Sequence, residues 1–135
     1  MKTALVSKVC IIDDDKLYVS LITIMIEKNS FAKDLLIFEN GRDALDYFST
    51  AIDDPNEVLP NVILLDLNMP VMNGWEFLEQ MEPFAKKMLE RRIKLNIVSS
   101  TINPTEVHRA ESHKIVHNFI TKPVSKNAIA NAFLD

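Results

Sequence analysis

Five short apolar runs divide the chain. They are rich in Val, Ile and Leu, and they span Val9–Ile12, Leu35–Phe38, Val62–Leu65, Leu95–Val98 and Val116–Ile120. Nearly continuous hydrophobicity over so few residues is typical of strands that are covered on both faces, as in a parallel sheet. The pattern therefore predicts five strands, although length alone does not exclude short buried helices.

Between these runs, apolar residues recur at the spacing of one helix face. The segment Lys16–Asn29 carries Leu17, Leu21, Ile24 and Met25, the segment Gly41–Ala51 carries Ala44, Leu45 and Phe48, and the segment 75–89 carries Phe77, Leu78, Met81 and Leu89. We expect these stripes to face a core. Pro83 is expected to kink or split the third helix, because proline lacks the N–H that a helix interior needs.

Two further helices are indicated by their start signals. Asn103-Pro104-Thr105-Glu106 combines a capping residue, a proline at the first helical position and an acid at the third. Ser125 is a candidate cap for a last helix that ends at Leu134. Strands and helices thus alternate, which predicts an α/β fold with a doubly wound parallel sheet. In the flavodoxin-like strand order 2-1-3-4-5, the first and third strands are neighbours.

Length and composition fit one domain. The chain has 135 residues, of which 47% are hydrophobic and 25% are charged, as in ordinary globular proteins. No apolar run approaches the roughly 18–20 residues that cross a bilayer, and the N-terminal apolar stretch is too short for a signal peptide. The one cysteine, Cys10, has no partner for an internal disulfide. We expect a single domain over residues 1–135, without an output domain, in the cytoplasm and away from membranes.

The charge balance argues against nucleic acid as a direct partner. The net charge is −4, whereas a duplex-binding domain normally shows a basic face. The basic clusters Lys86-Lys87 and Arg91-Arg92 are short, and Glu90 interrupts the segment that carries them. We therefore look for a site built from acids.

Polar residues stand at the ends of four of the apolar runs. Asp13 and Asp14 follow the first run, Asp66 the third, Ser99 the fourth and Lys122 the fifth. In an open α/β sheet, ligands bind beyond the carboxyl ends of the strands, near the point where the strand order reverses. We expect these side chains to converge on one rim of the sheet.

Such a set of side chains favours a metal ion and a phosphoryl group. Three nearby carboxylates repel one another, and a divalent cation relieves the repulsion. Mg²⁺ prefers hard oxygen ligands and keeps waters for a phosphate. An ammonium and a hydroxyl can hold phosphoryl oxygens around a nucleophilic carboxylate. The sequence thus indicates a site where an aspartate forms an acyl phosphate.

Over essentially its whole length, the sequence resembles the receiver domain of two-component response regulators, in its stand-alone form. The matching features are the acid pair Asp13-Asp14 after an apolar run, the stretch Asp66-x-x-Met69-Pro70-x-x-x-Gly74, the hydroxyl at Ser99, and Lys122-Pro123. Each feature is weak alone, but the four together, in this order on five strand–helix units, are specific.

The resemblance implies a role for each position. Asp66 would accept a phosphoryl group from a histidine kinase or a histidine phosphotransfer protein. Mg²⁺ would be bound by Asp14, Asp66 and the backbone carbonyl of Asn68, with Asp13 acting through a metal-bound water. Lys122 would pair with Asp66 and then with the phosphoryl group. The domain would be a signalling protein rather than an enzyme, with slow autodephosphorylation at most.

The resemblance also implies a conformational switch. Ser99 would move to donate a hydrogen bond to the phosphoryl oxygen, and Phe119 would fill the space that it leaves. The surface formed by the helix after Asn103, the strand Val116–Ile120 and the helix after Ser125 would then bind a downstream protein. The peptide bond before Pro123 would be cis, a form that costs little only before proline. The oligomeric state stays open.

The helix predicted at Lys16–Asn29 leaves two interpretations open. Besides its core stripe it carries Val19, Ile22 and Ile26 on other faces. This extra apolar surface could dock a helical kinase or phosphotransfer domain. Alternatively, the helix could be buried on several sides.

Three features depart from the usual pattern of the family. The hydroxyl residue is Ser99 where threonine is more frequent, Asp15 adds a third acid to the first pair, and the stretch Gln80–Arg92 is longer and more charged. The last feature predicts an extended third helix or loop. It bears on the choice of partner rather than on the chemistry.

Other interpretations fit parts of the sequence. A haloacid-dehalogenase-like phosphatase also uses the pattern Asp13-x-Asp15, but it needs an acid pair after the lysine, where this chain has only Asp135. A binding module could keep the fold without being phosphorylated. The histidines at 113 and 117 have a helical ligand spacing, but the predicted helix ends near position 113. We therefore expect His108, His113 and His117 to be surface residues.

Overall fold

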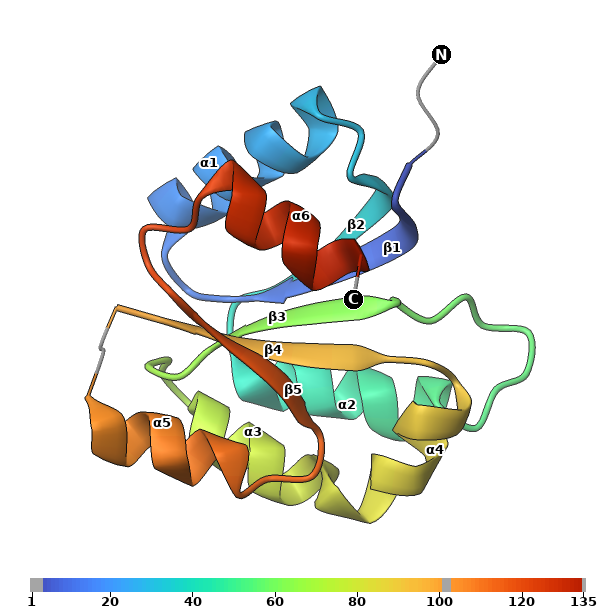
Figure 1. The fold of residues 1–135 in the computed structure, drawn as a ribbon. Coiled ribbons are helices and arrows are strands. Elements are labelled where there is room, and N and C mark those ends of the chain that lie inside the picture. The colour runs from blue at the N-terminus through green and yellow to red at the C-terminus, as the bar shows by residue number, and fades with distance from the viewer. Residues whose placement is uncertain (1–3, 101–102, 135) are drawn as a thin grey trace.

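The computed structural model describes residues 4–100 and 103–134. Five strands form one parallel sheet in the order β2-β1-β3-β4-β5 (Figure 1). The strands are β1 (Val6–Ile12), β2 (Ala32–Phe38), β3 (Val62–Asp66), β4 (Lys94–Ser99) and β5 (Val116–Thr121). Each strand contains the apolar run that predicted it, so the predicted fold class and strand order are confirmed.

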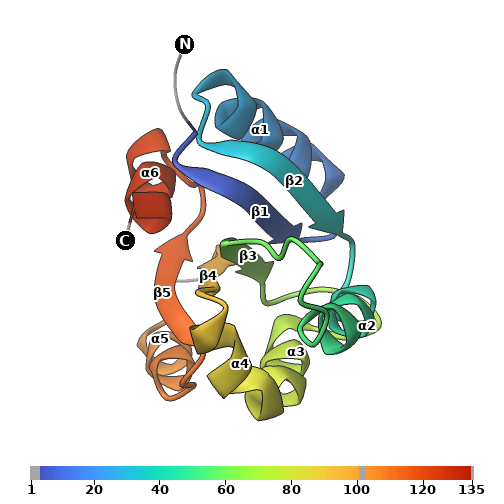
Figure 2. The ribbon, with the colours of Figure 1, turned by 90° about the vertical axis from the view of Figure 1, so that its right-hand side faces the viewer.

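Helices flank the sheet on both faces. They are α1 (Lys16–Lys28), α2 (Gly41–Ala51), α3 (Gly74–Met81), the short 3-10 helix η1 (Glu82–Phe84), α4 (Ala85–Glu90), α5 (Pro104–Glu111) and α6 (Lys126–Leu134). Two perpendicular views show α1 and α6 on one face and α2, α3, α4 and α5 on the other (Figures 1 and 2). Among the described residues, no helix has the length and apolar character of a membrane span.

Each face of the sheet has its own core, because successive residues of a strand point to opposite faces. Val9 of β1 packs in a cluster with Ile22 of α1. Its neighbour Cys10 packs in a second cluster with Phe48 of α2 and Phe77 of α3. The central strands are therefore buried along their whole width, which explains why they are continuous apolar runs in the sequence.

Polar side chains fix where the helices begin. Four residues that precede a helix accept a hydrogen bond from a backbone N–H in its first turn: Asp15, Asn40, Asn73 and Asn103. Ser125 does the same for α6, through the N–H of Ala128 at 3.1 Å. The predicted helix starts at Asn103 and Ser125 are therefore confirmed. Asp15, the third acid of its run, serves as the cap of α1.

The face of α1 that packs on the sheet differs from the prediction. Ile22 and Ile26 are buried, whereas Leu17, Leu21 and Ile24 are 71%, 59% and 59% exposed. The prediction is wrong for these three residues, whereas the fourth residue of the predicted stripe, Met25, is half-buried and packs against the core. Helix α1 carries apolar residues on nearly every face, and packing against the sheet and α6 selects the face of Ile22 and Ile26. Those two residues are core, and the exposed apolar surface of α1 lies on its other side.

The segment predicted as one helix with a proline break forms three elements. Pro83 lies in η1, where the chain turns from α3 into α4. The break shifts the helical phase, so Met88 is buried while Leu89 is 79% exposed. The prediction of Leu89 as a core residue is therefore wrong. The longer stretch noted in the sequence is this additional helix, which leads into β4.

Cys10 lies within β1 and is fully buried. Burial raises the pKa of its thiol far above the ordinary value. The side chain therefore acts as a small apolar residue of the core.

Candidate functional site

Three carboxylates meet where β1 and β3 end. These strands are adjacent and parallel, so Asp13, one residue beyond β1, lies beside Asp66, the last residue of β3. Carboxylate oxygens of Asp13, Asp14 and Asp66 lie within 4.8 Å of one another. Asp13 and Asp66 are buried, and Asp14 is exposed. The structure thus brings together the three acids that the strand ends predicted.

Local hydrogen bonds hold Asp13 in place. The backbone N–H of Asp15 donates to Asp13 Oδ1 over 2.9 Å. The Asp15 carboxylate in turn accepts from the backbone N–H of Tyr18 over 3.1 Å. The acid run is therefore an ordered turn, in which two acids join the cluster and the third begins α1.

The loop after β3 approaches Asp66 closely. The N–H of Gly74 donates to the carbonyl of Leu67 over 3.0 Å. A Cβ atom at Gly74 would lie 2.5 Å from the carbonyl oxygen of Asp66, so only glycine fits there. Within the loop, Val71 has a φ of 67°, which is unfavourable for a β-branched residue, and its side chain is 80% exposed. The loop holds the Asp66 backbone and leaves Val71 strained.

Lys122, just beyond β5, reaches into the acid cluster. Its Nζ lies 2.9 Å from Asp13 Oδ2 and 3.7 Å from Asp66 Oδ1. Its backbone N–H donates to the carbonyl of Ser99 over 2.8 Å, which ties the end of β5 to the end of β4. The peptide bond between Lys122 and Pro123 is cis. Lys122 is within ion-pair distance of Asp66, the partner that the resemblance implies, but its shorter contact is to Asp13. The two acids therefore share one cation.

Tyr18 covers Lys122 from the side of α1. The Lys122 Nζ lies 4.1 Å from the centre of the Tyr18 ring, a cation–π contact. Burial, together with the charges of Asp13 and Asp66, raises the pKa of Tyr18. Sequence reasoning missed this residue. The available signal was its position three residues after the helix cap Asp15, which turns it back toward the site.

Burial alters the ionisation of the clustered acids. Burial raises the pKa of Asp66 to about 6; the charge of Asp13 adds to the rise, and the Lys122 ammonium and the backbone N–H of Asn68 oppose it. Burial also raises the pKa of Asp13, although hydrogen bonds from Asp15 and Lys122 oppose the shift. In both cases burial is the largest cause of the raised pKa, and the charge of a neighbouring acid adds to the rise.

The donor set fits a hard divalent cation. Three carboxylates offer oxygen ligands within one small volume, and a single ammonium opposes their charge. Mg²⁺ takes such ligands together with waters and backbone carbonyls. Asp13, Asp14 and Asp66 therefore fit Mg²⁺, and Asn68, two residues beyond Asp66, is exposed at the same rim.

Ser99 and Phe119 lie on the two strands next to the cluster. Ser99 is buried at the end of β4, one residue beyond Val98, which pairs with Asp66. Phe119 is half-buried on β5 and packs against the core formed with α2, α3 and α5. The hydroxyl that the sequence singled out is thus close to Asp66 in the sheet, and the aromatic ring lies on the neighbouring strand.

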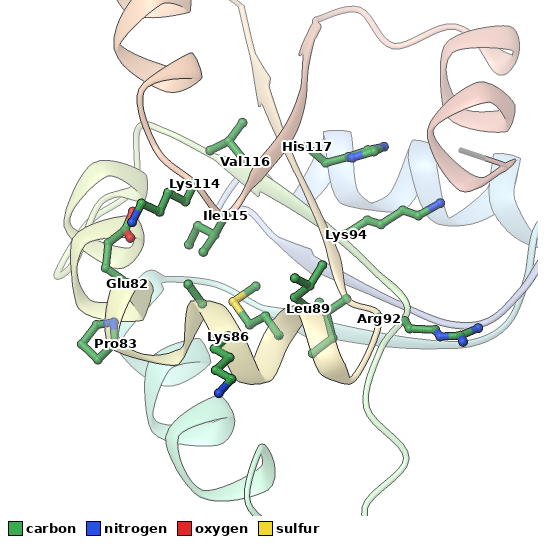
Figure 3. Close-up of a pocket in the computed structure, with 13 residues that line it drawn as sticks. Glu82, Pro83, Lys86, Leu89, Arg92, Lys94, Lys114, Ile115, Val116 and His117 are labelled. Carbon is green, nitrogen blue, oxygen red and sulfur yellow. The ribbon is translucent and has the colours of Figure 1, made fainter.

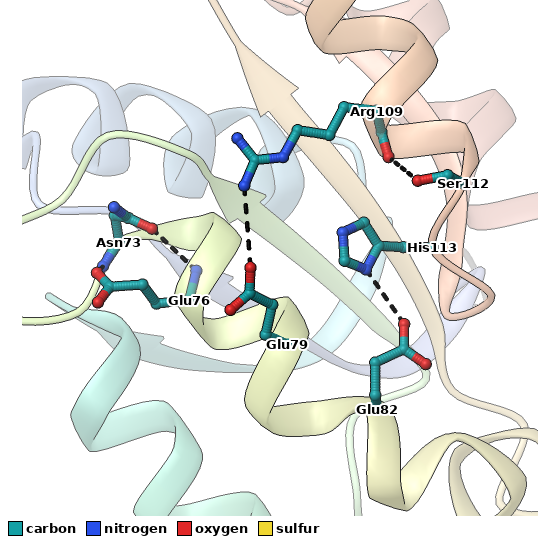
Figure 4. Close-up of polar contacts among 7 residues, drawn as sticks. All are labelled: Asn73, Glu76, Glu79, Glu82, Arg109, Ser112 and His113. Atoms are coloured by element: carbon teal, nitrogen blue, oxygen red, sulfur yellow. Dashed lines mark hydrogen bonds and ion pairs between the residues drawn. The ribbon is translucent and has the colours of Figure 1, made fainter.

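The histidines take separate roles. His108 and His117 are exposed, but His113 is half-buried, with Nδ1 3.1 Å from Glu82 Oε1 (Figure 4). The expectation of a surface residue is therefore wrong for His113, because the turn after α5 places it against η1. Over residues 4–100 and 103–134, the one group of three potential metal ligands is the acid cluster.

Further contacts that the sequence did not reveal connect α3 with α5. The Arg109 guanidinium lies 4.2 Å from the centre of the Trp75 ring and 3.9 Å from Glu79 Oε1, the second contact being drawn in Figure 4. The His113 ring also lies near Trp75, with 6.1 Å between the centroids of the two rings. Trp75, a residue of α3, therefore packs against Arg109 of α5 and against His113, just beyond that helix.

Comparison with known proteins gives one family for the chain. A family model described as the response regulator receiver domain matches residues 9–134. The matched range contains all three acids, Ser99 and Lys122. It also includes the additional helix α4.

Two curated proteins are similar in sequence. The probable methanogenesis regulatory protein FilR2 of Methanothrix harundinacea is 26% identical over 117 residues, which cover 87% of this chain and 72% of that protein. The protein-glutamate methylesterase/protein-glutamine glutaminase of Halalkalibacterium halodurans is 32% identical over 117 residues. That match covers 86% of this chain but only 30% of the relative, so it involves one part of a longer protein.

Solved structures share the fold. A two-component response regulator from Cytophaga hutchinsonii superposes with a TM-score of 0.84 at 24% identity, over 98% of this chain and 96% of that chain. The bacteriophytochrome response regulator RtBRR superposes with a TM-score of 0.75 at 26% identity, over 96% of this chain and 78% of that chain. Both similarities extend across the whole sheet and its helices.

Proposed function

The chain belongs to the response regulator receiver domain family, a family of two-component signalling, and on this premise we propose that Asp66 accepts a phosphoryl group from a phosphohistidine. The donor would be a histidine kinase or a histidine phosphotransfer protein. The observation that carries the proposal is the buried Asp66 carboxylate, 3.7 Å from the Lys122 ammonium and clustered with two further acids. An ordinary solvated turn would not gather these groups at one strand end.

In the proposed transfer, a carboxylate oxygen of Asp66 attacks the phosphorus of the donor. The new O–P bond forms as the P–N bond of the phosphohistidine breaks. The electron pair of that bond stays with the imidazole, which then takes up a proton. The product is an acyl phosphate on Asp66 and a neutral histidine on the donor.

The residues around Asp66 hold the arriving group. Lys122 contacts both buried acids and can turn from Asp13 to a phosphoryl oxygen, since its ammonium has three donors. The Ser99 hydroxyl donates to another phosphoryl oxygen. Mg²⁺, held by Asp14, Asp66 and the carbonyl of Asn68, with Asp13 acting through a water, would supply the positive charge that balances carboxylates and phosphate.

We expect the modified site to switch a binding surface. Phosphorylation adds charge and three strong acceptor oxygens beside Ser99. If Ser99 moves toward them, the space that it leaves is available to Phe119 on the adjacent strand. The surface of α5, β5 and α6 then changes its population of conformations, and a downstream partner recognises the change.

The exposed side of α1 is a suitable dock for the phosphodonor. Leu17, Leu21 and Ile24 form an apolar strip there, on the helix that begins beside the acid cluster. A helical donor domain could cover this strip while its phosphohistidine faces Asp66. This replaces the docking face suggested by the sequence, since Ile22 and Ile26 are core residues.

The proposal is tested by phosphorylation with acetyl phosphate and Mg²⁺. We expect one phosphoryl group per chain by intact-mass spectrometry, none on the Asp66→Asn variant, and normal labelling of Asp34→Asn, an exposed acid on β2. A wild-type chain that stays unmodified would contradict the proposal. Steady hydrolysis of a generic phosphomonoester would instead support a phosphatase.

A further inference from the structure

The Lys122 side chain is confined in a way that an ordinary surface lysine is not. Its ammonium lies 2.9 Å from Asp13 Oδ2 and 3.7 Å from Asp66 Oδ1, and only 18% of the side chain is exposed. Lys86 illustrates the ordinary case. It is exposed, extends outward from α4 (Figure 3), and has no carboxylate within ion-pair distance in the described part of the chain. Holding Lys122 in one place costs conformational entropy, which the contacts around it must offset.

The Tyr18 ring supplies a third contact of this ammonium. The ring centre lies 4.1 Å from Lys122 Nζ, well inside the roughly 6 Å of a cation–π contact. An ammonium carries three N–H groups, and the two acids and the ring give each of them a neighbour. The ring also shields the cation from water, which strengthens its attraction to the carboxylates.

The turn that places Asp13 also places Tyr18. The backbone N–H of Asp15 donates to Asp13 Oδ1 over 2.9 Å, and the Asp15 carboxylate accepts from the backbone N–H of Tyr18 over 3.1 Å. The ring of Tyr18 then packs against the core between the sheet, α1 and α6. Two of the three groups that hold Lys122 therefore come from one ordered segment, the start of α1.

The hydroxyl of Tyr18 does not explain its position. Over residues 4–100 and 103–134, its oxygen is buried and has no hydrogen-bond partner. A buried hydroxyl without a partner lowers stability rather than raising it. The contact that Tyr18 makes with the acid cluster is therefore the contact of its ring with Lys122.

We propose that Tyr18 is a positioning residue of the phosphorylation site, an inference that rests on the proposed phosphoryl transfer to Asp66. Its ring keeps the Lys122 ammonium beside the two buried acids, so that a short swing from Asp13 brings it to the arriving phosphoryl oxygen. Without the ring, the flexible four-carbon side chain could extend into water. A cation that is already in place stabilises the charge of the transition state without a cost of reorganisation. Tyr18 thus raises the rate of phosphorylation through Lys122.

The experiment measures the rate of labelling by acetyl phosphate and Mg²⁺ in variants of position 18. Tyr18→Leu keeps an apolar side chain but removes the ring, and should slow labelling by about threefold or more. Tyr18→Phe keeps the ring and should label as fast as the wild type. Tyr47→Leu, at the other tyrosine of the chain, on α2 and across the sheet from α1, should also label normally. Circular dichroism checks that each variant is folded.

Two further measurements separate positioning from packing. In a Lys122→Met background, Tyr18→Leu should cause no additional slowing, because the ring acts through the ammonium. In ¹H–¹³C spectra, the ring current of Tyr18 should shift the Hε protons of Lys122 upfield of those of Lys86. This shift should persist in Tyr18→Phe and disappear in Tyr18→Leu. A purely structural role of Tyr18 would give neither result.

The outcomes distinguish this inference from the proposed function. A wild-type chain that stays unlabelled would overturn both. With a labelled wild type, three results would each overturn the role of the ring alone: an unchanged rate for Tyr18→Leu, additional slowing in the Lys122→Met background, or Lys122 resonances without an upfield shift. Slow labelling of Tyr18→Phe would assign the role to the hydroxyl instead. If Tyr18→Leu fails to fold, Tyr18→Met takes its place in each comparison.

Discussion

Asp66 combines two demands that conflict at the scale of one residue. A carboxylate at the end of a buried strand is positioned for chemistry, but it is separated from water and lies beside a second buried acid. Without a cation, burial raises the pKa of Asp66 to about 6, so the folded state holds this proton more tightly than the unfolded chain does. The same burial that places the group for the proposed phosphoryl transfer makes the metal-free protein less stable near neutral pH.

This conflict predicts a pH-dependent effect of Asp66→Asn. The folded pKa of Asp66 is about 6, above the ordinary value, so its contribution to stability is fully present at low pH and is lost as the pH rises through 6. In the absence of metal, the variant should gain about 2 kcal/mol more over the wild type at pH 8 than at pH 4. Urea unfolding at both pH values measures this. Asp34→Asn should show no such gain, and a pH-independent difference for Asp66→Asn would contradict the account.

Gly74 is predicted to be irreplaceable. A methyl group there would lie 2.5 Å from the Asp66 carbonyl oxygen and 2.7 Å from the Leu67 Cα, both backbone atoms that cannot move aside easily. Gly74→Ala should cost about 2–3 kcal/mol despite the better helix propensity of alanine. It should also slow phosphorylation by acetyl phosphate, since it displaces Asp66. Thermal unfolding and labelling rates measure both effects, and a stable, normally labelled variant would refute the tight fit.

Substitution of Val71, in the same loop, is predicted to raise the stability of the protein rather than lower it. Its φ of 67° disfavours a β-branched side chain, and the side chain is exposed. Val71→Gly should stabilise the protein by up to about 1 kcal/mol, because relief of the strain exceeds the added chain entropy of glycine. Thermal unfolding measures the change. A clear loss of stability would show that the Val71 side chain makes stabilising contacts in the folded state.

At the scale of the element, α1 shows that the periodicity of apolar residues alone does not identify the buried face of a helix. Its apolar residues fit more than one stripe, and the stripe of Leu17, Leu21 and Ile24 is as regular as the buried face of Ile22 and Ile26. The choice depends on contacts with α6, which is distant in the sequence. By contrast, the observed bounds of α2 are those predicted, because its polar face and its Asn40 cap are compatible with only one position of the helix.

The exposed strip of α1 predicts a selective kinetic defect. Leu21→Glu should slow phosphotransfer from a histidine phosphotransfer protein by about tenfold or more, because it places a charge in an apolar interface. Labelling by acetyl phosphate should not change, since that small donor needs no dock. Leu89→Glu, an equally exposed leucine on α4, is the matched control. Equal rates for all three proteins with the protein donor would reject docking on α1.

At the scale of the whole molecule, the sequence was sufficient to predict which residues meet. Asp13 and Asp66 end neighbouring parallel strands, so the topology alone brings them together. The sharing of Lys122 between the two acids was not predictable, because it depends on side-chain distances across residues 109 positions apart. The contacts of Lys122 with Tyr18 and of Arg109 with Trp75 were not predictable from the sequence for the same reason.

The position of Trp75 predicts an optical signal of activation. It is the single tryptophan of the chain, and the Arg109 guanidinium of α5 lies 4.2 Å from its ring. If phosphorylation moves α5, the environment of the indole changes. Acetyl phosphate with Mg²⁺ should therefore alter the tryptophan emission of the wild type but not of Asp66→Asn. Complete labelling by mass without a change in emission would show that α5 stays in place.

The burial of Cys10 has a practical consequence for following such motions. The native thiol is shielded by the sheet and poorly ionised, so maleimide and similar reagents should not reach it while the protein is folded. A cysteine introduced on the outer side of α5 or α6 would then be the one reactive position. Spin labels or fluorophores could be attached there in the natural background, with no need to remove a residue from the core.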